Sequence, residues 1–189
     1  KAKDMIKSEK ISRWLIYQTN QGTDDHIMEA SISSLEPYTS VKVRGTVASM
    51  PEIIGGGHLI FQITNGRKTV DCTVYEPAKN FRFKAEKLRP GDIITVYGGV
   101  REEPFTINVE KLHIEKSARY TEKTGNPVCP SCKKRMKSTG KNQGYRCSCG
   151  AKAKESQAEF SVVKRELKTG WYEPPVGSRR HLALPLKRQ

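Results

Sequence analysis

The sequence predicts a mainly β protein in which a five-stranded OB-fold barrel is followed by a metal-binding cysteine ribbon. Residues 38–116 contain five strand-like segments, with one short helical segment between the third and the fourth, which is the element order of an OB-fold. Two close pairs of cysteines come next, Cys129 with Cys132 and Cys147 with Cys149. Paired thiols at this spacing supply the four ligands of a tetrahedral metal.

The first 36 residues contain too few elements for a core of their own. Residues 14–17 are an apolar run that predicts a buried strand, and a polar turn at residues 19–26 follows. One strand cannot bury a core, so we expect this segment to end a domain that begins upstream. Asp24, Asp25 and His26 are candidate metal or phosphate ligands, although such a loop more often only caps the element that follows.

Residues 37–116 form the predicted barrel. Asn65-Gly66, between the second and third strands, is the preferred dipeptide of a two-residue hairpin turn. Cys72 shares a strand face with Val70 and Val74, and we interpret it as a buried structural thiol because no activating helix start lies beside it. The predicted elements are strands at 41–47, 59–63, 70–74, 93–100 and 105–114 and a helix at 81–88.

An OB-fold binds single strands on the outer face of its second and third strands and through the adjacent loops. If Leu59, Phe61 and Ile63 face the core, the outer face carries the polar and aromatic residues between and beyond them, including Thr73. The alternative for each of these is plain packing, because a Tyr or His on a strand is often half-buried. The candidate RNA contacts of the barrel are His58, Gln62 and Tyr75 and, for phosphate, Arg67, Lys68 and Arg101.

The four paired cysteines predict a structural metal site. Four protein thiolates fill every position of a tetrahedral metal, so Cys129, Cys132, Cys147 and Cys149 indicate a zinc ribbon and not a catalytic centre. Two disulfides are the less favoured alternative, because disulfide frameworks belong to small secreted chains. Iron in a rubredoxin-like site stays open, since thiolates bind both metals.

Most of the formal net charge of +14 lies in the C-terminal part of the chain. Residues 117–189 contain 17 Lys and Arg against 5 Asp and Glu, a balance of +12, whereas residues 1–116 contain 17 against 15, a balance of +2. This concentration predicts a polyanionic partner, and nucleic acid is favoured over a membrane surface because no long amphipathic run accompanies the charge. The candidate phosphate contacts are Lys133, Lys134, Arg135, Lys137, Arg179 and Arg180.

The chain contains no apolar run of ~20 residues and no signal peptide, so we expect a cytoplasmic protein. Beyond the barrel we predict a linker at residues 117–127, then the zinc ribbon with a basic, helix-prone segment at residues 128–170. Residues 171–189 are predicted as an extended arm, because their prolines preclude a continuous helix. The arm is rich in aromatic residues and arginine, and both docking along RNA and packing on the ribbon stay open.

The order of these parts resembles the C-terminal half of the archaeal tRNA agmatinylcytidine synthetase family. Three stretches carry the resemblance, and of these the loop and the tail together are specific, whereas a cysteine ribbon alone is common. The stretches are the loop Asn20-Gln21-Gly22-Thr23-Asp24-Asp25-His26, the ribbon with Asn126-Pro127-Val128-Cys129-Pro130-Ser131-Cys132, Met136-Lys137-Ser138 and Cys147-Ser148-Cys149-Gly150, and the tail Trp171-Tyr172-Glu173-Pro174-Pro175 with Arg179-Arg180-His181-Leu182.

The resemblance implies a tRNA-modifying ligase. Such an enzyme joins agmatine to the wobble cytidine of an isoleucine tRNA, which then decodes AUA. It uses ATP and Mg²⁺ to phosphorylate the ring carbonyl oxygen of the cytidine, and the amine of agmatine then displaces phosphate.

The resemblance further implies that residues 1–36 end a ferredoxin-like domain. ATP, Mg²⁺ and agmatine would be bound by a kinase-like catalytic domain upstream of Lys1, which no stretch of this chain matches. On this interpretation the chain is the tRNA-holding half of the enzyme, contains no catalytic residue and is inactive alone. The alternative is a free-standing OB-fold and zinc-ribbon protein that binds single-stranded nucleic acid.

Overall fold

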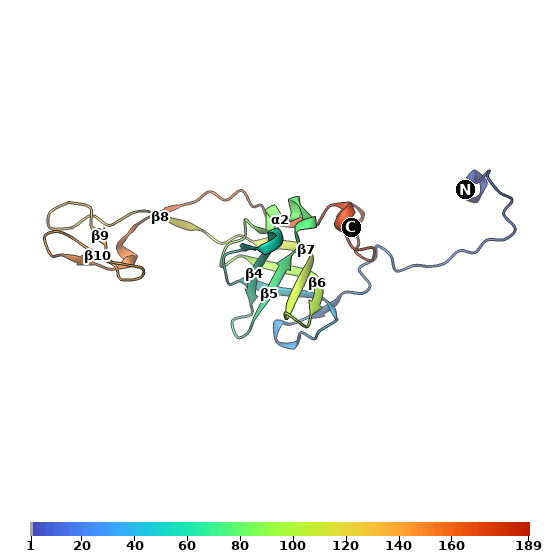
Figure 1. The fold of residues 1–189 in the computed structure, drawn as a ribbon, viewed down its shortest axis with the longest axis horizontal. Helices are drawn as coiled ribbons and strands as arrows, with labels where there is room; N and C mark the ends of the chain where they lie inside the picture. Colours follow the sequence, from blue (N-terminus) through green and yellow to red (C-terminus); the bar gives the residue numbers. More distant parts are fainter. Residues whose placement is uncertain (1) are drawn as a thin grey trace.

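The computed structural model describes residues 2–189, and a β-barrel occupies its centre (Figure 1). A small module with the four cysteines, residues 126–158, lies at the left end of Figure 1, and we call it the cysteine module. An extended N-terminal segment leads away on the opposite side, whereas the C-terminal segment returns to the barrel.

Five long strands build the barrel. They pair in the order β2-β6-β7-β5-β4, and a further pairing of β2 with β4 closes the ring. Adjacent strands are antiparallel except β5 and β7, which are parallel. The closed ring confirms the predicted OB-fold. The strands are β2 (Ser40–Val47), β4 (His58–Thr64), β5 (Thr69–Val74), β6 (Ile93–Arg101) and β7 (Thr106–Lys116).

Side chains that alternate along these strands fill the barrel interior. Val43, Phe61 and Cys72, from three different strands, are each at most 1 % exposed. Burial raises the pKa of the Cys72 thiol and keeps it neutral, as expected of a structural thiol. Helix α2 (Asn80–Ala85), between β5 and β6, adds Phe81 to the same core.

The turn between β4 and β5 is displaced by one residue from its predicted position. The amide of Asn65 donates to the Lys68 carbonyl at 3.2 Å, so the two turn residues are Gly66 and Arg67. Gly66 adopts φ = +87°, which glycine takes without strain. Asn65 stabilises the turn in another way, because its Oδ1 accepts hydrogen bonds from the amides of Arg67 and Lys68.

The remaining elements are short. Strand β1 runs parallel to β2, and β3 pairs with β4. These elements are α1 (Ala2–Met5), β1 (Met28–Ala30), β3 (Glu52–Ile54) and the 3-10 helices η1 (Ile32–Ser34), η2 (Gly55–Gly57), η3 (Glu76–Ala78), η4 (Glu155–Gln157), η5 (Val176–Ser178) and η6 (Leu186–Arg188). None of the helices within residues 2–189 is long and apolar enough to cross a membrane.

The apolar run at residues 14–17 is not a buried strand, so that prediction is wrong. Leu15, Ile16 and Tyr17 are 74 %, 84 % and 78 % exposed and lie outside every described strand. The five barrel strands close the core among themselves, and the run lies in the segment that extends away from the barrel (Figure 1).

Two strands connect the barrel to the cysteine module. Strand β8 (Thr121–Gly125) pairs antiparallel with β12 (Glu159–Val162), and we call this pair the stalk. The expected linker therefore contains a strand. The basic segment after the cysteines, expected to be helix-prone, forms only a short 3-10 helix and a strand. The aromatic and β-branched residues Phe160 and Val162 favour a strand there once a partner is present.

The C-terminal arm packs on the barrel and not on the ribbon. Docking of its exposed side along RNA stays a prediction. Strand β13 (Gly170–Tyr172) adds antiparallel to β7. The Trp171 ring stacks on His113, with ring centroids 4.4 Å apart, and tilts against Tyr97 at 5.4 Å. These contacts fix the start of the arm.

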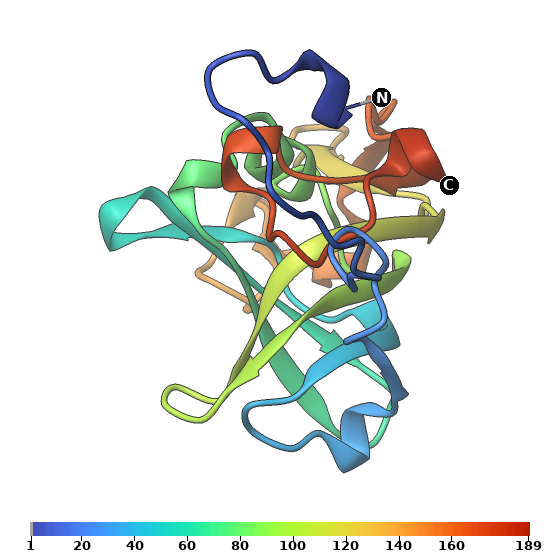
Figure 2. The ribbon, with the colours of Figure 1, turned by 90° about the vertical axis from the view of Figure 1, so that its right-hand side faces the viewer.

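The end of the chain also binds the polar loop near its start. The amides of Gly22, Thr23 and Asp24 donate to the carbonyls of His181 and Leu182 at 2.9–3.1 Å. Figure 2 shows the N-terminal segment in blue and the C-terminal arm in red crossing the same end of the barrel. The loop is therefore held between the barrel and the arm.

Candidate metal centre and nucleic-acid interface

Two tight turns hold the four cysteines. In the first, the Lys133 amide donates to the Cys129 carbonyl at 3.0 Å, and the Cys129 amide donates to the Lys134 carbonyl at 2.9 Å. In the second, the Gly150 amide donates to the Cys147 carbonyl at 3.0 Å. Lys133 and Gly150 adopt φ = +58° and +92°, which closes each turn so that its two thiols face the other turn.

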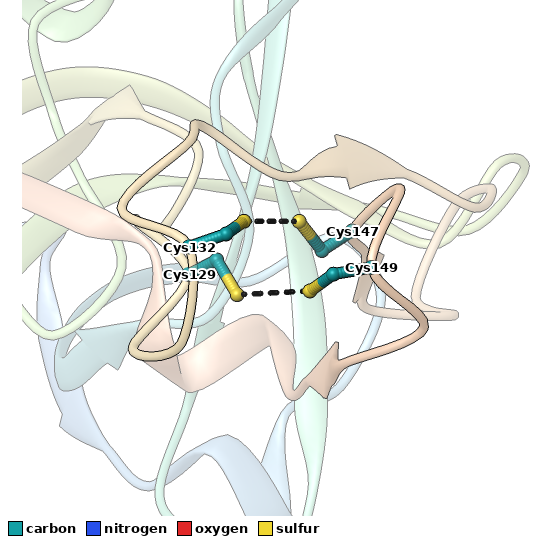
Figure 3. A group of neighbouring side chains, drawn as sticks. All are labelled: Cys129, Cys132, Cys147 and Cys149. Atoms are coloured by element: carbon teal, nitrogen blue, oxygen red, sulfur yellow. Dashed lines mark hydrogen bonds between the residues drawn. The ribbon is translucent and has the colours of Figure 1, made fainter.

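The four Sγ atoms converge between these turns (Figure 3). All four lie within 4.8 Å of one another, with Cys129 to Cys149 at 3.5 Å and Cys132 to Cys147 at 3.3 Å. A disulfide bond is about 2.05 Å long, and all four cysteines are free. Zinc bound at about 2.3 Å holds tetrahedral sulfurs about 3.8 Å apart. The residues therefore fit a tetrahedral metal.

The electrostatics of the cluster favour a cation at its centre. The Cys132 amide is the main cause that lowers the pKa of Cys129 to about 6, and the Cys149 amide lowers the pKa of Cys147. For Cys132 the Lys134 amide lowers the pKa, but the neighbouring thiols outweigh it and raise the pKa to about 11. Four thiolates this close repel one another, and a bound dication removes that repulsion.

The cysteine module has a very small core. Met136 and Tyr145 are buried beside Cys129 and Cys147, and three short strands surround them: β9 (Lys137–Ser138), β10 (Tyr145–Arg146) and β11 (Lys152–Ala153). So few apolar side chains cannot stabilise a module of this size. Metal binding would supply the missing folding free energy.

The structure brings together three of the predicted RNA contacts of the barrel. The edge of the His58 ring meets the Tyr75 ring at a centroid distance of 4.9 Å, and Arg101 donates a hydrogen bond to the Tyr75 hydroxyl. His58 Nδ1 accepts from the Glu76 amide at 3.1 Å. The two rings are therefore held in place, whereas the Arg101 side chain stays exposed.

The other candidates on the barrel lie along the β4–β5 hairpin. Arg67 and Lys68 are exposed at its turn. Gln62 is exposed too, but its Nε2 donates to Asp71 Oδ1 at 2.8 Å. Thr73, expected on the open face, is only 6 % exposed, so that expectation is wrong.

The basic residues of the cysteine module divide into two kinds. Lys133, Lys134 and Lys137 are exposed. Arg135 is exposed too, but it forms an ion pair with Glu159 of the stalk at 2.8 Å. This pair ties the module to the stalk.

Two of the three arginines of the arm, Arg179 and Arg180, also differ. Arg179 Nη2 lies 2.6 Å from Glu173 Oε1, and both side chains are largely buried, so this arginine stabilises the arm itself. Arg180 Nε lies 3.0 Å from Glu110 Oε1, and half of its side chain is exposed. Of these two, Arg180 is the one that has surface left to offer a ligand.

Asp24 and His26 belong to a largely buried polar cluster. Asp24 Oδ1 accepts from the Leu184 amide at 2.7 Å, and Asp24 also pairs with Lys111, whose side chain is 2 % exposed. His26 Nε2 lies 3.7 Å from Glu110 Oε2. The cluster joins the polar loop, β7 and the arm, which favours the structural interpretation of this loop.

One exposed aromatic residue, Tyr38, is not indicated by any sequence pattern. Its side chain is 82 % exposed, and its φ of +64° is rare for an aromatic residue. Tyr38 follows Pro37 before the first barrel strand, where no periodicity marks a side chain as buried or exposed. Only the folded backbone shows its position.

Two family models match the chain. The model described as the TiaS C-terminal zinc ribbon domain matches residues 126–167, which cover the cysteine module and the returning strand of the stalk. The model described as an OB-fold nucleic acid binding domain matches residues 41–115, which are the barrel.

Curated relatives match nearly the whole chain. The isoleucine-tRNA 2-agmatinylcytidine synthetase TiaS of Methanocaldococcus jannaschii is 42 % identical over 188 residues, which are 99 % of this chain and 44 % of the relative. The protein of the same name from Archaeoglobus fulgidus is 44 % identical over 191 residues, 100 % of this chain and 44 % of the relative. The chain thus spans less than half the length of these relatives.

Solved structures agree with the sequence relatives. The crystal structure of apo TiaS, an isoleucine-tRNA agmatidine synthetase, superposes with a TM-score of 0.68 at 40 % identity, over 96 % of this chain and 43 % of that chain. The complex of TiaS with its isoleucine tRNA and ATP superposes with a TM-score of 0.70 at 39 % identity, over 90 % of this chain and 39 % of that one. The complex of TiaS with the same tRNA, AMPCPP and agmatine gives 0.71 at 35 % identity, over 96 % and 41 %.

Proposed function

We propose that this chain, which belongs to the isoleucine-tRNA 2-agmatinylcytidine synthetase family, is the tRNA-binding part of such an enzyme. It corresponds to the C-terminal part of the family's members. The observation that carries this proposal is the shared arrangement of barrel, stalk and cysteine module with a relative crystallised on an isoleucine tRNA. The enzyme would attach agmatine, with ATP and Mg²⁺, to the wobble cytidine of that tRNA. These small molecules would bind in the part of the relatives that this chain does not match, a kinase-like domain.

The distribution of charge and aromatic residues supports tRNA as the partner. Residues 117–189 carry a balance of +12, and Lys133, Lys134 and Lys137 are exposed on the cysteine module. The barrel adds the His58 and Tyr75 rings beside Arg101. Lysines of this kind neutralise phosphates without reading sequence, whereas aromatic faces stack on unpaired bases.

We infer a division of the chain that follows these parts. Residues 1–36 would end a ferredoxin-like domain, residues 37–116 form the OB-fold, and residues 117–127 lead through the first stalk strand. Residues 128–170 hold the zinc ribbon and the return strand, and residues 171–189 form the arm. In support, the arm forms backbone hydrogen bonds with the polar loop of residues 1–36, at Gly22 to Asp24.

We also infer that the metal is zinc, held by Cys129, Cys132, Cys147 and Cys149. The match to a zinc ribbon model and the convergence of the four Sγ atoms within 4.8 Å support this assignment. Zinc bound there would order the module and leave no position open for a substrate.

The test is direct binding and activity of the 189-residue chain. We expect it to bind a transcript of the isoleucine tRNA in a filter or fluorescence titration, and to incorporate no labelled agmatine when ATP and Mg²⁺ are added. A tRNA of equal length with a different acceptor identity and anticodon is the matched control for specificity.

Two results would contradict the proposal. Incorporation of agmatine by this chain alone would place the catalytic site within residues 1–189. Tighter binding to an unstructured oligonucleotide than to folded tRNA would favour the free-standing single-strand-binding protein.

A further inference from the structure

A groove of about 730 Å³ opens on the barrel beside the loop between β6 and β7. This volume is in the range of small-ligand sites. Its lining combines aromatic rings, guanidinium groups and an amide that come from four separate parts of the chain. The residues that matter for the argument are Tyr38, Tyr75, Arg101, Glu102, Asn108 and Arg180.

Tyr38 is held at this groove in a strained conformation. Its backbone has φ = +64°, which costs free energy in a bulky residue and is often found at functional sites. The Tyr38 amide donates to the Val100 carbonyl at 2.9 Å, and the hydroxyl donates to Glu102 Oε2 at 2.6 Å. Both ends of the residue are thus fixed, while 82 % of its side chain faces solvent. A fixed, exposed ring is a surface on which a base can stack.

Two guanidinium groups line the same groove. Arg101 donates to the Tyr75 hydroxyl, and within residues 2–189 no carboxylate forms an ion pair with it. Arg180 is anchored to Glu110 through its Nε at 3.0 Å. Its terminal nitrogens lie over Gly99, where an added Cβ would be 3.5 Å from Nη2. Because Arg180 pairs with Glu110 through Nε, its terminal nitrogens Nη1 and Nη2 are available to a ligand.

Two acidic residues, Glu102 and Glu103, also line the groove, next to Arg101 in the sequence. Glu102 accepts the hydrogen bond of the Tyr38 hydroxyl, so it orients the ring, and its negative charge repels phosphate on that side. A phosphate in the groove is therefore directed toward Arg101 and Arg180. Asn108, paired with Gly99 in the β6–β7 ladder, offers both a donor and an acceptor to the edge of a base.

We propose that this groove binds one unpaired nucleotide of the RNA, with its base against Tyr38 and its phosphate between Arg101 and Arg180. The proposal rests on the function proposed above and deepens it, because it assigns an unpaired nucleotide of the RNA to the barrel. It also explains why Tyr38 keeps a strained backbone in an exposed position.

The test uses a short single-stranded RNA that contains 2-aminopurine, together with the isoleucine tRNA. In Tyr38→Gly the ring is lost but the residue suits a positive φ, so the melting temperature should not fall. We expect the affinity of this variant for the short RNA to drop about 5- to 150-fold, as for the loss of one stacked base. The quenching of 2-aminopurine on binding should disappear as well. Tyr38→Phe should retain both properties.

Phe105→Ala is the matched control. Phe105 is an exposed aromatic residue of the same β6–β7 loop, 45 % exposed, and is outside the groove lining, so its loss should leave the affinity for the short RNA unchanged. Unchanged affinity and quenching in Tyr38→Gly would overturn the groove assignment while tRNA binding stands. A wild-type chain that does not bind tRNA at all would instead overturn the proposed function.

Discussion

At the scale of single residues, one buried carboxylate fixes where the stalk leaves the barrel and where it returns. Asp92 is fully buried and accepts hydrogen bonds from the amides of Arg89 at 2.8 Å and Ala118 at 2.7 Å. It also forms a two-pronged ion pair with Arg165, which donates in turn to the Lys87 carbonyl at 2.8 Å. Ala118 precedes the first stalk strand, and Arg165 follows the second. The turn before Asp92 is visible in the sequence as Arg-Pro-Gly-Asp, but its partner 73 residues away is not.

Asp92→Ala should therefore destabilise the barrel strongly. Removal of one partner leaves the Arg165 charge buried and unpaired, which typically costs ~3–5 kcal/mol. Thermal or urea unfolding measured by circular dichroism checks this. Lys87→Ala is the control, because it removes only the surface pair with Glu166 and should cost less than ~1 kcal/mol. Equal effects of the two substitutions would contradict the role of Asp92.

At the scale of elements, those whose pattern is local were predictable and those that depend on distant partners were not. The valines of β2 alternate at positions 41, 43 and 47 and are buried as expected. Strand β13 has only three residues and exists because β7 offers it an edge. The same holds for β8 and β12, which form a sheet only with each other. Propensity alone is too weak for such strands.

Trp171→Ala should weaken the docking of the arm on the barrel. The Trp171 ring stacks on His113 at 4.4 Å, and loss of an aromatic pair with its buried area costs roughly 1–2 kcal/mol. The melting temperature of the barrel should fall accordingly. Val176→Ala, on the same arm but 74 % exposed, should leave it unchanged. A stable Trp171 variant with weakened tRNA binding would show that this ring contacts RNA instead.

Cys147→Ser should release the metal and unfold the cysteine module while the barrel stays folded. The module core consists of Met136 and Tyr145 beside the cysteines, so metal binding and folding are coupled. Elemental analysis should find about one zinc per wild-type chain and none in the variant. The barrel transition should persist, since the barrel has its own core. Absence of both zinc and iron from the wild-type chain would overturn the metal site.

At the scale of the whole molecule, the sequence predicted the cluster of metal ligands better than it predicted which basic residues are available to RNA. The four cysteines carry their spacing in the sequence, so their convergence could be predicted from two turns. Basic residues have no such pattern. Arg135 and Arg179 form ion pairs with Glu159 and Glu173, partners that charge counting cannot identify. Lys133 and Lys134 are exposed, and within residues 2–189 neither has a carboxylate partner.

Replacement of Lys133 and Lys134 together by alanine should flatten the salt dependence of tRNA binding. Each phosphate contact contributes about 0.9 to the slope of log K against log salt concentration, so the slope should decrease by at most ~1.8, with little change in which RNA is preferred. A titration series over salt concentration measures this. The charge-matched control replaces Lys7 and Lys10 of the extended N-terminal segment, and its slope should not change. Equal slopes in the two variants would exclude phosphate contacts by Lys133 and Lys134.

The return of the C-terminal arm to β7 sets an order of events during protein synthesis. Roughly fifty residues are translated between the end of β7 and the start of β13, which takes several seconds at ~5–20 residues per second. During this interval the segment of β7 from Leu112 to Ile114 lacks its β13 partner, and an unpaired strand edge can recruit another chain. The contact between Asp24 and Leu184 spans 160 residues and closes later still. In a nascent or truncated chain this edge is therefore open to pairing with another chain, and translation of the arm covers it.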